Sequence, residues 1–147
     1  MKEFKTDIII DAPLEKVWQI FTDFGSYAKW NPFIKELTGQ MTAGNKIKAV
    51  IQPAGKSPMT FKPVLLNNTF QKEFRWKGSF VIKGLFDGEH YFKFNKLSND
   101  STQVIQGEIF TRILVKPIVA LIGKGTLNGF KSMNKALKQN AELFKID

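Results

Sequence analysis

The chain has 147 residues, of which 43% are hydrophobic, enough to fill the core of one ordinary domain. It contains no cysteine and a single histidine, which excludes disulfides, thiolate metal sites, cysteine nucleophiles and His-rich metal sites. The formal net charge is +9, but the lysines are scattered and only two of the 22 basic residues are arginine. Proteins that read nucleic acid use arginine more heavily. We therefore interpret the charge as a solvated basic surface and expect no nucleic-acid partner.

The ends of the chain predict neither a leader nor a membrane span. Near the N-terminus the only apolar run is residues 8–10, which is too short for a secretory leader. The longest late apolar run, residues 117–122, is far shorter than a bilayer requires. No linker, repeat or low-complexity segment interrupts the pattern. We expect one domain over residues 1–147, cytoplasmic and without integral membrane association.

The N-terminal segment predicts a strand followed by two short helices. The strand covers residues 3–10, and Asp11 is a plausible N-cap for the helix that follows. Four apolar side chains then fall at the spacing of one helical face: Leu14, Val17, Trp18 and Phe21. A second short helix or turn is expected over residues 23–28. It must end before Pro32, because a residue before proline is pushed out of the α region.

About eighty residues of aromatic-rich strand pattern follow. The expected strands cover residues 33–37, 46–52, 59–66, 70–77, 89–96 and 102–112, separated by turn-forming residues. The last two strands predict a hairpin across residues 97–101. Setting Lys96 opposite Thr102 places three further pairs on one face: Phe94 with Val104, Phe92 with Gln106 and His90 with Glu108.

The C-terminal segment predicts one long amphipathic helix over residues 118–144. Five apolar side chains form a stripe at helical spacing: Phe130, Met133, Leu137, Ala141 and Phe144. Gly129 and two earlier glycines disfavour a regular helix, so they indicate irregular first turns or a close approach to another element. The order of elements favours an α+β domain in which a curved antiparallel sheet packs around this helix.

The aromatic face of the sheet also carries polar groups, which is typical of a ligand pocket. His90 and Glu108 would be neighbours there, able to act as a general base and its orienting acid, or simply to satisfy each other. Trp76 is the first choice for stacking on a flat ligand, and Trp30 is placed to close one mouth of the cavity. The full set expected to line the ligand site is Trp30, Phe61, Phe74, Trp76, Phe92, Phe94, Gln106, Phe110, Phe130 and Met133.

Several motifs, in order along nearly the whole chain, resemble the START-like, or SRPBCC, superfamily. They are Ile8-Ile9-Ile10-Asp11-Ala12-Pro13 with Val17-Trp18, then Trp30-Asn31-Pro32-Phe33-Ile34, Trp76-Lys77-Gly78, residues 84–90, residues 106–110 and residues 129–137. Together they are similar to the polyketide cyclase/dehydrase-like branch of small bacterial ligand-binding proteins.

The resemblance implies a helix-grip fold. In it, a seven-stranded antiparallel sheet curls round the C-terminal helix, and two short helices close one end. It also implies an elongated hydrophobic cavity for lipids, sterols, polyketides or other aromatic molecules. We expect no cofactor. One departure is Thr111-Arg112, where relatives often carry glycine after the Glu-x-Phe of the last strand.

Three functions remain open. The leading hypothesis is a binding module for a small apolar or aromatic ligand that performs no covalent chemistry. The alternative is a cyclase-, aldolase- or hydrolase-like enzyme that uses His90 and Glu108 as its acid/base pair. A weaker alternative is a co-chaperone-like domain that recognises an acidic protein partner through the basic surface.

Overall fold

The computed structural model describes residues 1–79, 87–111 and 115–143. The expected features at Gly84, Arg112 and Phe144 lie outside these residues. The described part contains three α-helices, α1 (Leu14–Thr22), α2 (Tyr27–Trp30) and α3 (Val115–Glu142), with a 3-10 turn at Phe24–Ser26. It also contains eight strands: β1 (Lys2–Ile10), β2 (Ile34–Thr38), β3 (Lys48–Ile51), β4 (Met59–Phe61), β5 (Val64–Thr69), β6 (Glu73–Ser79), β7 (Asp87–Ser98) and β8 (Ser101–Thr111).

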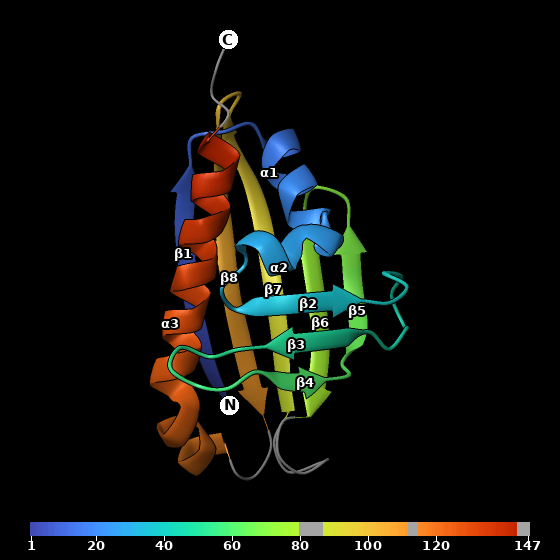
Figure 1. The fold of residues 1–147 in the computed structure, drawn as a ribbon, viewed down its shortest axis with the longest axis vertical. Helices are drawn as coiled ribbons and strands as arrows, with labels where there is room; N and C mark the ends of the chain where they lie inside the picture. Colours follow the sequence, from blue (N-terminus) through green and yellow to red (C-terminus); the bar gives the residue numbers. More distant parts are fainter. Residues whose placement is uncertain (80–86, 112–114, 144–147) are drawn as a thin grey trace.

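The strands form two antiparallel sheets. The larger sheet has the order β1-β8-β7-β6-β5, and the smaller one has the order β2-β3-β4. Figure 1 shows α3, the two short helices and the small sheet side by side, all covering the same face of the large sheet. This arrangement confirms the helix-grip fold that the sequence predicts.

The division into two sheets has a local cause at Pro63. We expected one strand over residues 59–66, but the chain leaves β4 at Phe61 and enters β5 at Val64. A proline has no N–H to donate to a ladder, so a central strand cannot run through it. β4 therefore pairs with β3, whereas β5 pairs with β6. The described residues thus carry eight strands where seven were expected.

The hairpin of β7 and β8 has the predicted register. Lys96 faces Thr102, and the three predicted pairs follow along the same face: Phe94 with Val104, Phe92 with Gln106 and His90 with Glu108. The six side chains of these three pairs are buried on the face that carries α3 and α1. The register is fixed because a shift of one residue would move the whole apolar set to the outer face.

Helix α1 buries the predicted face but does not have the predicted cap. Val17, Trp18 and Phe21 are all buried. The N-cap is Pro13 in an extended conformation, and no side chain caps the helix. The backbone N–H of Asp11 instead donates to Glu142 Oε2 at 2.7 Å. The Asp11 prediction is therefore wrong, because the helix begins two residues later than a cap at Asp11 requires.

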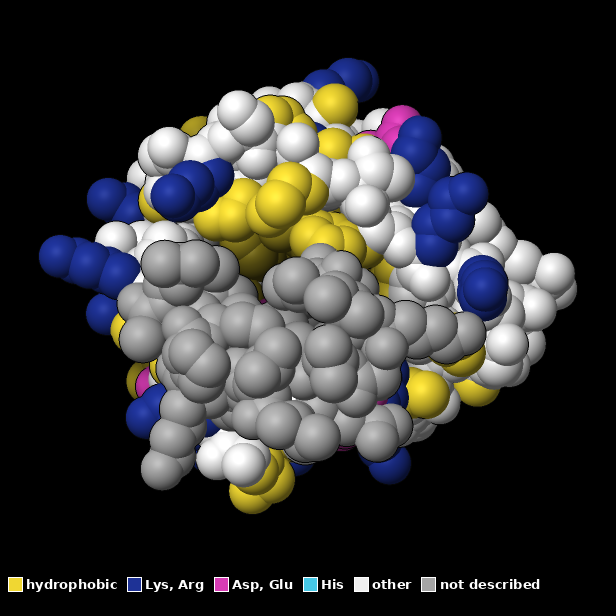
Figure 2. All heavy atoms as spheres, turned by 90° about the horizontal axis from the view of Figure 1, so that it is seen from below, with side chains coloured by type: hydrophobic (Ala, Val, Ile, Leu, Met, Phe, Trp, Pro, Cys, Tyr) yellow, Lys and Arg dark blue, Asp and Glu magenta, His cyan; other side chains and the backbone are white. Residues whose placement is uncertain are grey.

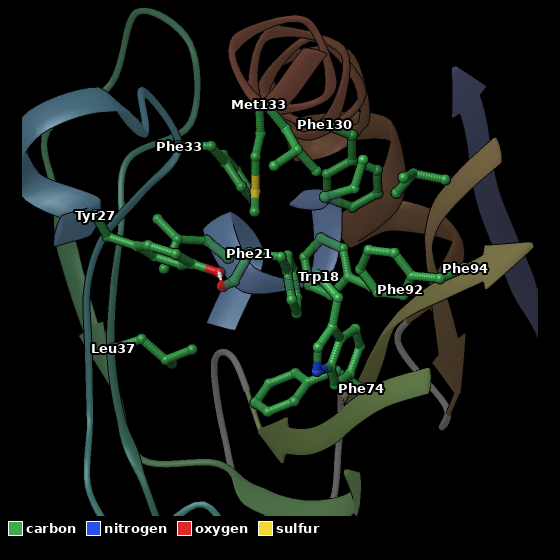
Figure 3. Close-up of a cluster of buried hydrophobic side chains, with 14 of the residues drawn as sticks. Trp18, Phe21, Tyr27, Phe33, Leu37, Phe74, Phe92, Phe94, Phe130 and Met133 are labelled. Atoms are coloured by element: carbon green, nitrogen blue, oxygen red, sulfur yellow. Dashed lines mark hydrogen bonds between the residues drawn. The ribbon is translucent and has the colours of Figure 1, made fainter. Parts of the chain in front are cut away.

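Phe21 lies at the centre of the aromatic core (Figure 3). Its ring centroid lies 4.7 Å from that of Phe92 and 4.9 Å from that of Phe94. The Tyr27 hydroxyl donates to the Phe21 carbonyl at 2.5 Å. Burial, together with the charge of Asp23, raises the pKa of the Tyr27 phenol well above its usual value, so the hydroxyl keeps its proton. Side chains of α1 and α2 thereby fill the middle of the space between the large sheet and α3.

Helix α3 packs with the predicted stripe. Phe130, Met133, Leu137 and Ala141 are buried. Gly129 lies directly against Phe33, and a Cβ at this position would overlap the Phe33 ring. The glycines were expected to mark either irregular first turns or a close approach to another element. Gly129 fits the close approach.

Gly107 permits a second close approach, on the outer face of the large sheet. The Tyr91 hydroxyl reaches across Gly107 to donate to Glu3 Oε2 at 2.6 Å. A Cβ on Gly107 would overlap that hydroxyl and lie 2.7 Å from the Phe4 carbonyl oxygen. Phe4 belongs to β1, whose backbone pairs with β8, so it cannot move without losing ladder bonds. We expect Gly107→Ala to lower the free energy of unfolding by about 1–3 kcal/mol, measured by urea denaturation.

Gly25→Ala is the matched control for this prediction. No heavy atom lies within 4 Å of the Cβ that this substitution would add. We expect a change within about 0.5 kcal/mol. Equal losses in the two variants would show that the Gly107 contact is not the cause.

Candidate functional site

A chain of buried polar side chains crosses the interior from the large sheet to α3. Gln106 Nε2 donates to Asn134 Oδ1 at 2.8 Å and to the Phe130 carbonyl oxygen at 3.3 Å. Asn134 Nδ2 donates to Thr6 Oγ1 at 2.9 Å. The Thr6 hydroxyl in turn donates to the backbone carbonyl oxygen of Gln106, also at 2.9 Å. The chain thus ends on two backbone carbonyls, which can only accept. Because both ends of the chain are acceptors, the side-chain amide nitrogen of Gln106 must face α3 and that of Asn134 must face Thr6.

His90 is the next member of this polar chain. Its Nε2 lies 3.0 Å from Gln106 Oε1, and its Nδ1 lies 3.3 Å from Glu108 Oε1. Because Gln106 Oε1 can only accept, Nε2 carries a proton. The imidazole is stacked on Trp76, with centroids 5.0 Å apart and planes at 19°, and on Phe33, at 6.2 Å and 26°. Ring contacts and hydrogen bonds together hold the imidazole in one orientation.

Glu108 connects this polar chain to a cavity. The residue is only 3% exposed, and its Oε2 is buried with no hydrogen-bond partner among the described residues. The cavity has a volume of about 60 Å³ and is lined by Phe33, Ile51, Pro53, Met59, Phe61, Glu108, Phe110 and Thr126. Figure 2 views the molecule from below, at the end where β8 finishes, and shows hydrophobic side chains along one side of a hollow.

The structure brings only some of the expected site residues to this cavity. Phe61, Phe110 and Glu108 line it, while His90 and Gln106 lie behind Glu108 as its hydrogen-bonded support. A second group belongs to the buried core instead: Phe74, Trp76, Phe92, Phe94, Phe130 and Met133. In the described residues these side chains pack against α1, α3 and one another, where the resemblance implied an elongated cavity.

The two tryptophans singled out from the sequence have other surroundings than expected. Trp76 is 2% exposed and stacks on His90. Trp30 packs against Tyr27, with centroids 5.2 Å apart, and does not line the cavity of Glu108. It lines a wider surface groove of about 610 Å³ formed by Lys16, Gln19, Ile20, Asp23, Ser26, Lys29, Trp30 and Asn140. Among the described residues that line this groove, the only carboxylate, that of Asp23, is exposed to solvent, so the smaller cavity with its buried carboxylate is the better ligand site.

Sequence reasoning missed several residues of the site. Phe33, Ile51 and Thr126 line the cavity, and Asn134 and Thr6 complete the polar chain. Asn134 gave a usable signal: it lies four residues after Phe130, so it is a polar side chain on the apolar face of the helix. Ile51 gave none, because its position depends on how the small sheet folds over the large one.

The described residues also bear on two other kinds of site. No group of three or more His, Asp or Glu side chains there is placed to hold a metal ion. None of the helices in the same residues combines the length and apolar character needed to cross a bilayer.

Comparison with known proteins identifies the family. A family model described as "Polyketide cyclase / dehydrase and lipid transport" matches residues 1–142. A comparison with curated protein sequences found no match. The match to the family model confirms the resemblance to START-like, polyketide cyclase-like proteins.

Solved structures from several organisms share this fold. A START superfamily protein from Mycobacterium smegmatis aligns with a TM-score of 0.69 and 18% identity, covering 97% of this chain and 99% of that one. The protein XoxI from Bacillus cereus aligns at 0.74 and 19%, covering 100% of both chains. Norcoclaurine synthase from Thalictrum flavum, in complex with dopamine and hydroxybenzaldehyde, aligns at 0.74 and 11%, covering 99% and 89%. At these identities the likeness shows the fold alone.

Proposed function

Because the chain belongs to the polyketide cyclase/dehydrase and lipid transport family, we propose that it binds a small apolar or aromatic molecule in the cavity beside Glu108. One observation carries the proposal: a buried carboxyl oxygen, Glu108 Oε2, has no partner among the described residues and lies in an apolar cavity. Leaving a buried polar atom unpaired costs about 1–3 kcal/mol. A ligand that bonds to this oxygen recovers that free energy and buries apolar surface as well.

The cavity suits part of a ring or the end of a longer apolar molecule, because it is well below the roughly 150 Å³ of a cavity that encloses a whole benzene. Its volume of about 60 Å³ exceeds the roughly 10–15 Å³ that one water needs on this measure. Met59 is 47% exposed and lines the cavity, so it lies where a ligand would enter. The rest of a longer ligand would extend outward past this side chain.

Toluene and phenol are suitable probes because each is a single ring. In protein labelled with ¹³C at the methionine methyl groups, four signals are available, from Met1, Met41, Met59 and Met133. We expect saturable shifts of the Met59 signal on titration with either probe, and little change at Met1, which is 92% exposed. A Met59 signal unmoved by both probes would contradict the proposal.

A matched pair of substitutions tests the location. Ile51→Phe places a bulkier, aromatic side chain in the cavity. Ile9→Phe makes the same change on β1, at a side chain that is 52% exposed. We expect the Ile51 variant to lose the Met59 response and the Ile9 variant to keep it. Circular dichroism of both variants checks that each is folded.

An enzymatic function is the second candidate, because Glu108 contacts His90 and also reaches the cavity. In that case the Glu108 carboxylate would accept a proton from the carbon next to a ligand carbonyl, leaving an enolate, while His90 holds Glu108 in place. A test is exchange of the α-protons of acetophenone-type ketones into D₂O, followed by NMR. The wild-type protein should accelerate exchange and Glu108→Gln should not; equal rates in both would remove this candidate.

A further inference from the structure

We propose that the ligand carries a hydrogen-bond donor, a hydroxyl or N–H group on an otherwise apolar frame, which donates to Glu108 Oε2. This inference rests on the proposed function, because it specifies the chemistry of a ligand in the same cavity. It begins with the direction of the polar chain, which two backbone carbonyls fix. The Phe130 carbonyl requires the amide nitrogen of Gln106 beside α3, so the amide oxygen must face His90.

The second step counts protons on the His90–Glu108 pair. His90 Nε2 uses its proton on Gln106 Oε1. The contact of 3.3 Å between Nδ1 and Glu108 Oε1 then needs one more proton between the two atoms. If that proton is on Nδ1, Glu108 is a carboxylate and Oε2 accepts. If it is on Oε1, Oε2 is the carbonyl oxygen of an acid and again accepts. Oε2 is an acceptor in both arrangements.

The third step concerns what surrounds that acceptor. Of the described residues that line the cavity, only Glu108 and Thr126 have polar side chains. A ligand whose only polar atom is an ether or ketone oxygen would set lone pairs against Oε2, and a carboxylate would add a like charge. A phenol or an alcohol fits, because its O–H points at Oε2 while the ring or chain contacts Phe33, Phe61 and Phe110.

The probes phenol and toluene differ only in O–H against CH₃, so their relative affinity reports this hydrogen bond. Dissociation constants come from the Met59 methyl signal in the wild type and in Glu108→Leu. We expect the preference for phenol over toluene to fall at least about tenfold in Glu108→Leu, as the loss of a hydrogen bond to a carboxyl group requires. An unchanged preference would overturn the inference, whereas failure of both probes to bind the wild type would overturn the proposed function.

Glu108→Gln is the matched variant of nearly the same shape. Its amide nitrogen would donate to His90 Nδ1, which leaves its oxygen facing the cavity as an acceptor. We expect this variant to keep most of the preference for phenol. A preference as low as that of Glu108→Leu would contradict the assigned direction of the hydrogen bonds.

The proton on His90 can be tested without a ligand. His90 is the only histidine in the chain, so ¹⁵N labelling of histidine gives the signals of one imidazole. We expect a directly bonded proton on Nε2 in the wild-type protein at neutral pH. An Nε2 without a proton would mean that the donors and acceptors of the polar chain run in the opposite direction. That result would overturn the inference even if the variants behaved as expected.

Discussion

Phe21→Ala is expected to lower the free energy of unfolding by about 3–5 kcal/mol, because it removes a large ring from the centre of the core. Phe21 is fully buried, and its ring contacts aromatic rings on the large sheet, on the 3-10 turn and on α2. These neighbours are themselves bulky and mutually packed, so they cannot close the space that the substitution leaves. Guanidinium denaturation followed by circular dichroism measures the loss.

Phe70→Ala is the control for this substitution. Phe70 is 71% exposed at the turn between β5 and β6, so the same truncation removes little buried area. We expect a change within about 0.5 kcal/mol. A loss in Phe21→Ala no larger than in Phe70→Ala would mean that the core relaxes around Phe21, contrary to the packing described above.

The sequence predicted the local geometry of the sheet and helices well. The register of β7 against β8 followed from period-two alternation and one short turn, both of which are local features. The buried faces of α1 and α3 followed from the 3.6-residue period in the same way. The start of α1 could not be predicted as well, because Asp11 has the right side chain for a cap but its N–H pairs with Glu142, far along the chain.

The nature of the aromatic face could not be read from the sequence. Phe74, Phe92 and Phe94 are the same side chains whether they line a cavity or fill a core. The choice depends on whether Trp18 and Phe21 of α1 reach down onto the sheet, and the structure shows that they do. The position of the small sheet, which brings Ile51 and Phe61 beside Glu108, is likewise a tertiary outcome with no local signal.

The pairing of His90 with Glu108 was predicted from the sequence only in part. Strand alternation predicted that the two side chains are neighbours, and the structure places Nδ1 and Oε1 3.3 Å apart. The alternation could not reveal that Gln106, on the same face, links the pair to α3 through Asn134. That link determines which imidazole nitrogen carries a proton and so which atom of Glu108 faces a ligand.

Gln106→Leu is expected to lower the free energy of unfolding by about 2–6 kcal/mol. The substitution supplies an apolar side chain of similar size, but it removes the amide oxygen that accepts from His90 and the amide nitrogen that donates to Asn134. His90 Nε2–H loses its acceptor and Asn134 Oδ1 loses its donor, and each buried unpaired group costs about 1–3 kcal/mol. Urea denaturation gives the loss of stability. The ¹⁵N spectrum of the single histidine should change at the same time.

Gln103→Leu provides the control on the same strand. Gln103 lies on the outer face of β8, and its bonds to Asp7 and Asn95 are exposed to water, which can replace them. We expect a change within about 0.5 kcal/mol and an unaltered histidine spectrum.

Gln106→Glu separates the two functions of the amide, because a carboxylate still accepts from His90 but cannot donate to Asn134. If the polar chain runs as described, this variant keeps the Nε2 proton and still loses stability. A variant as stable as the wild type would mean that α3 does not depend on the amide of Gln106.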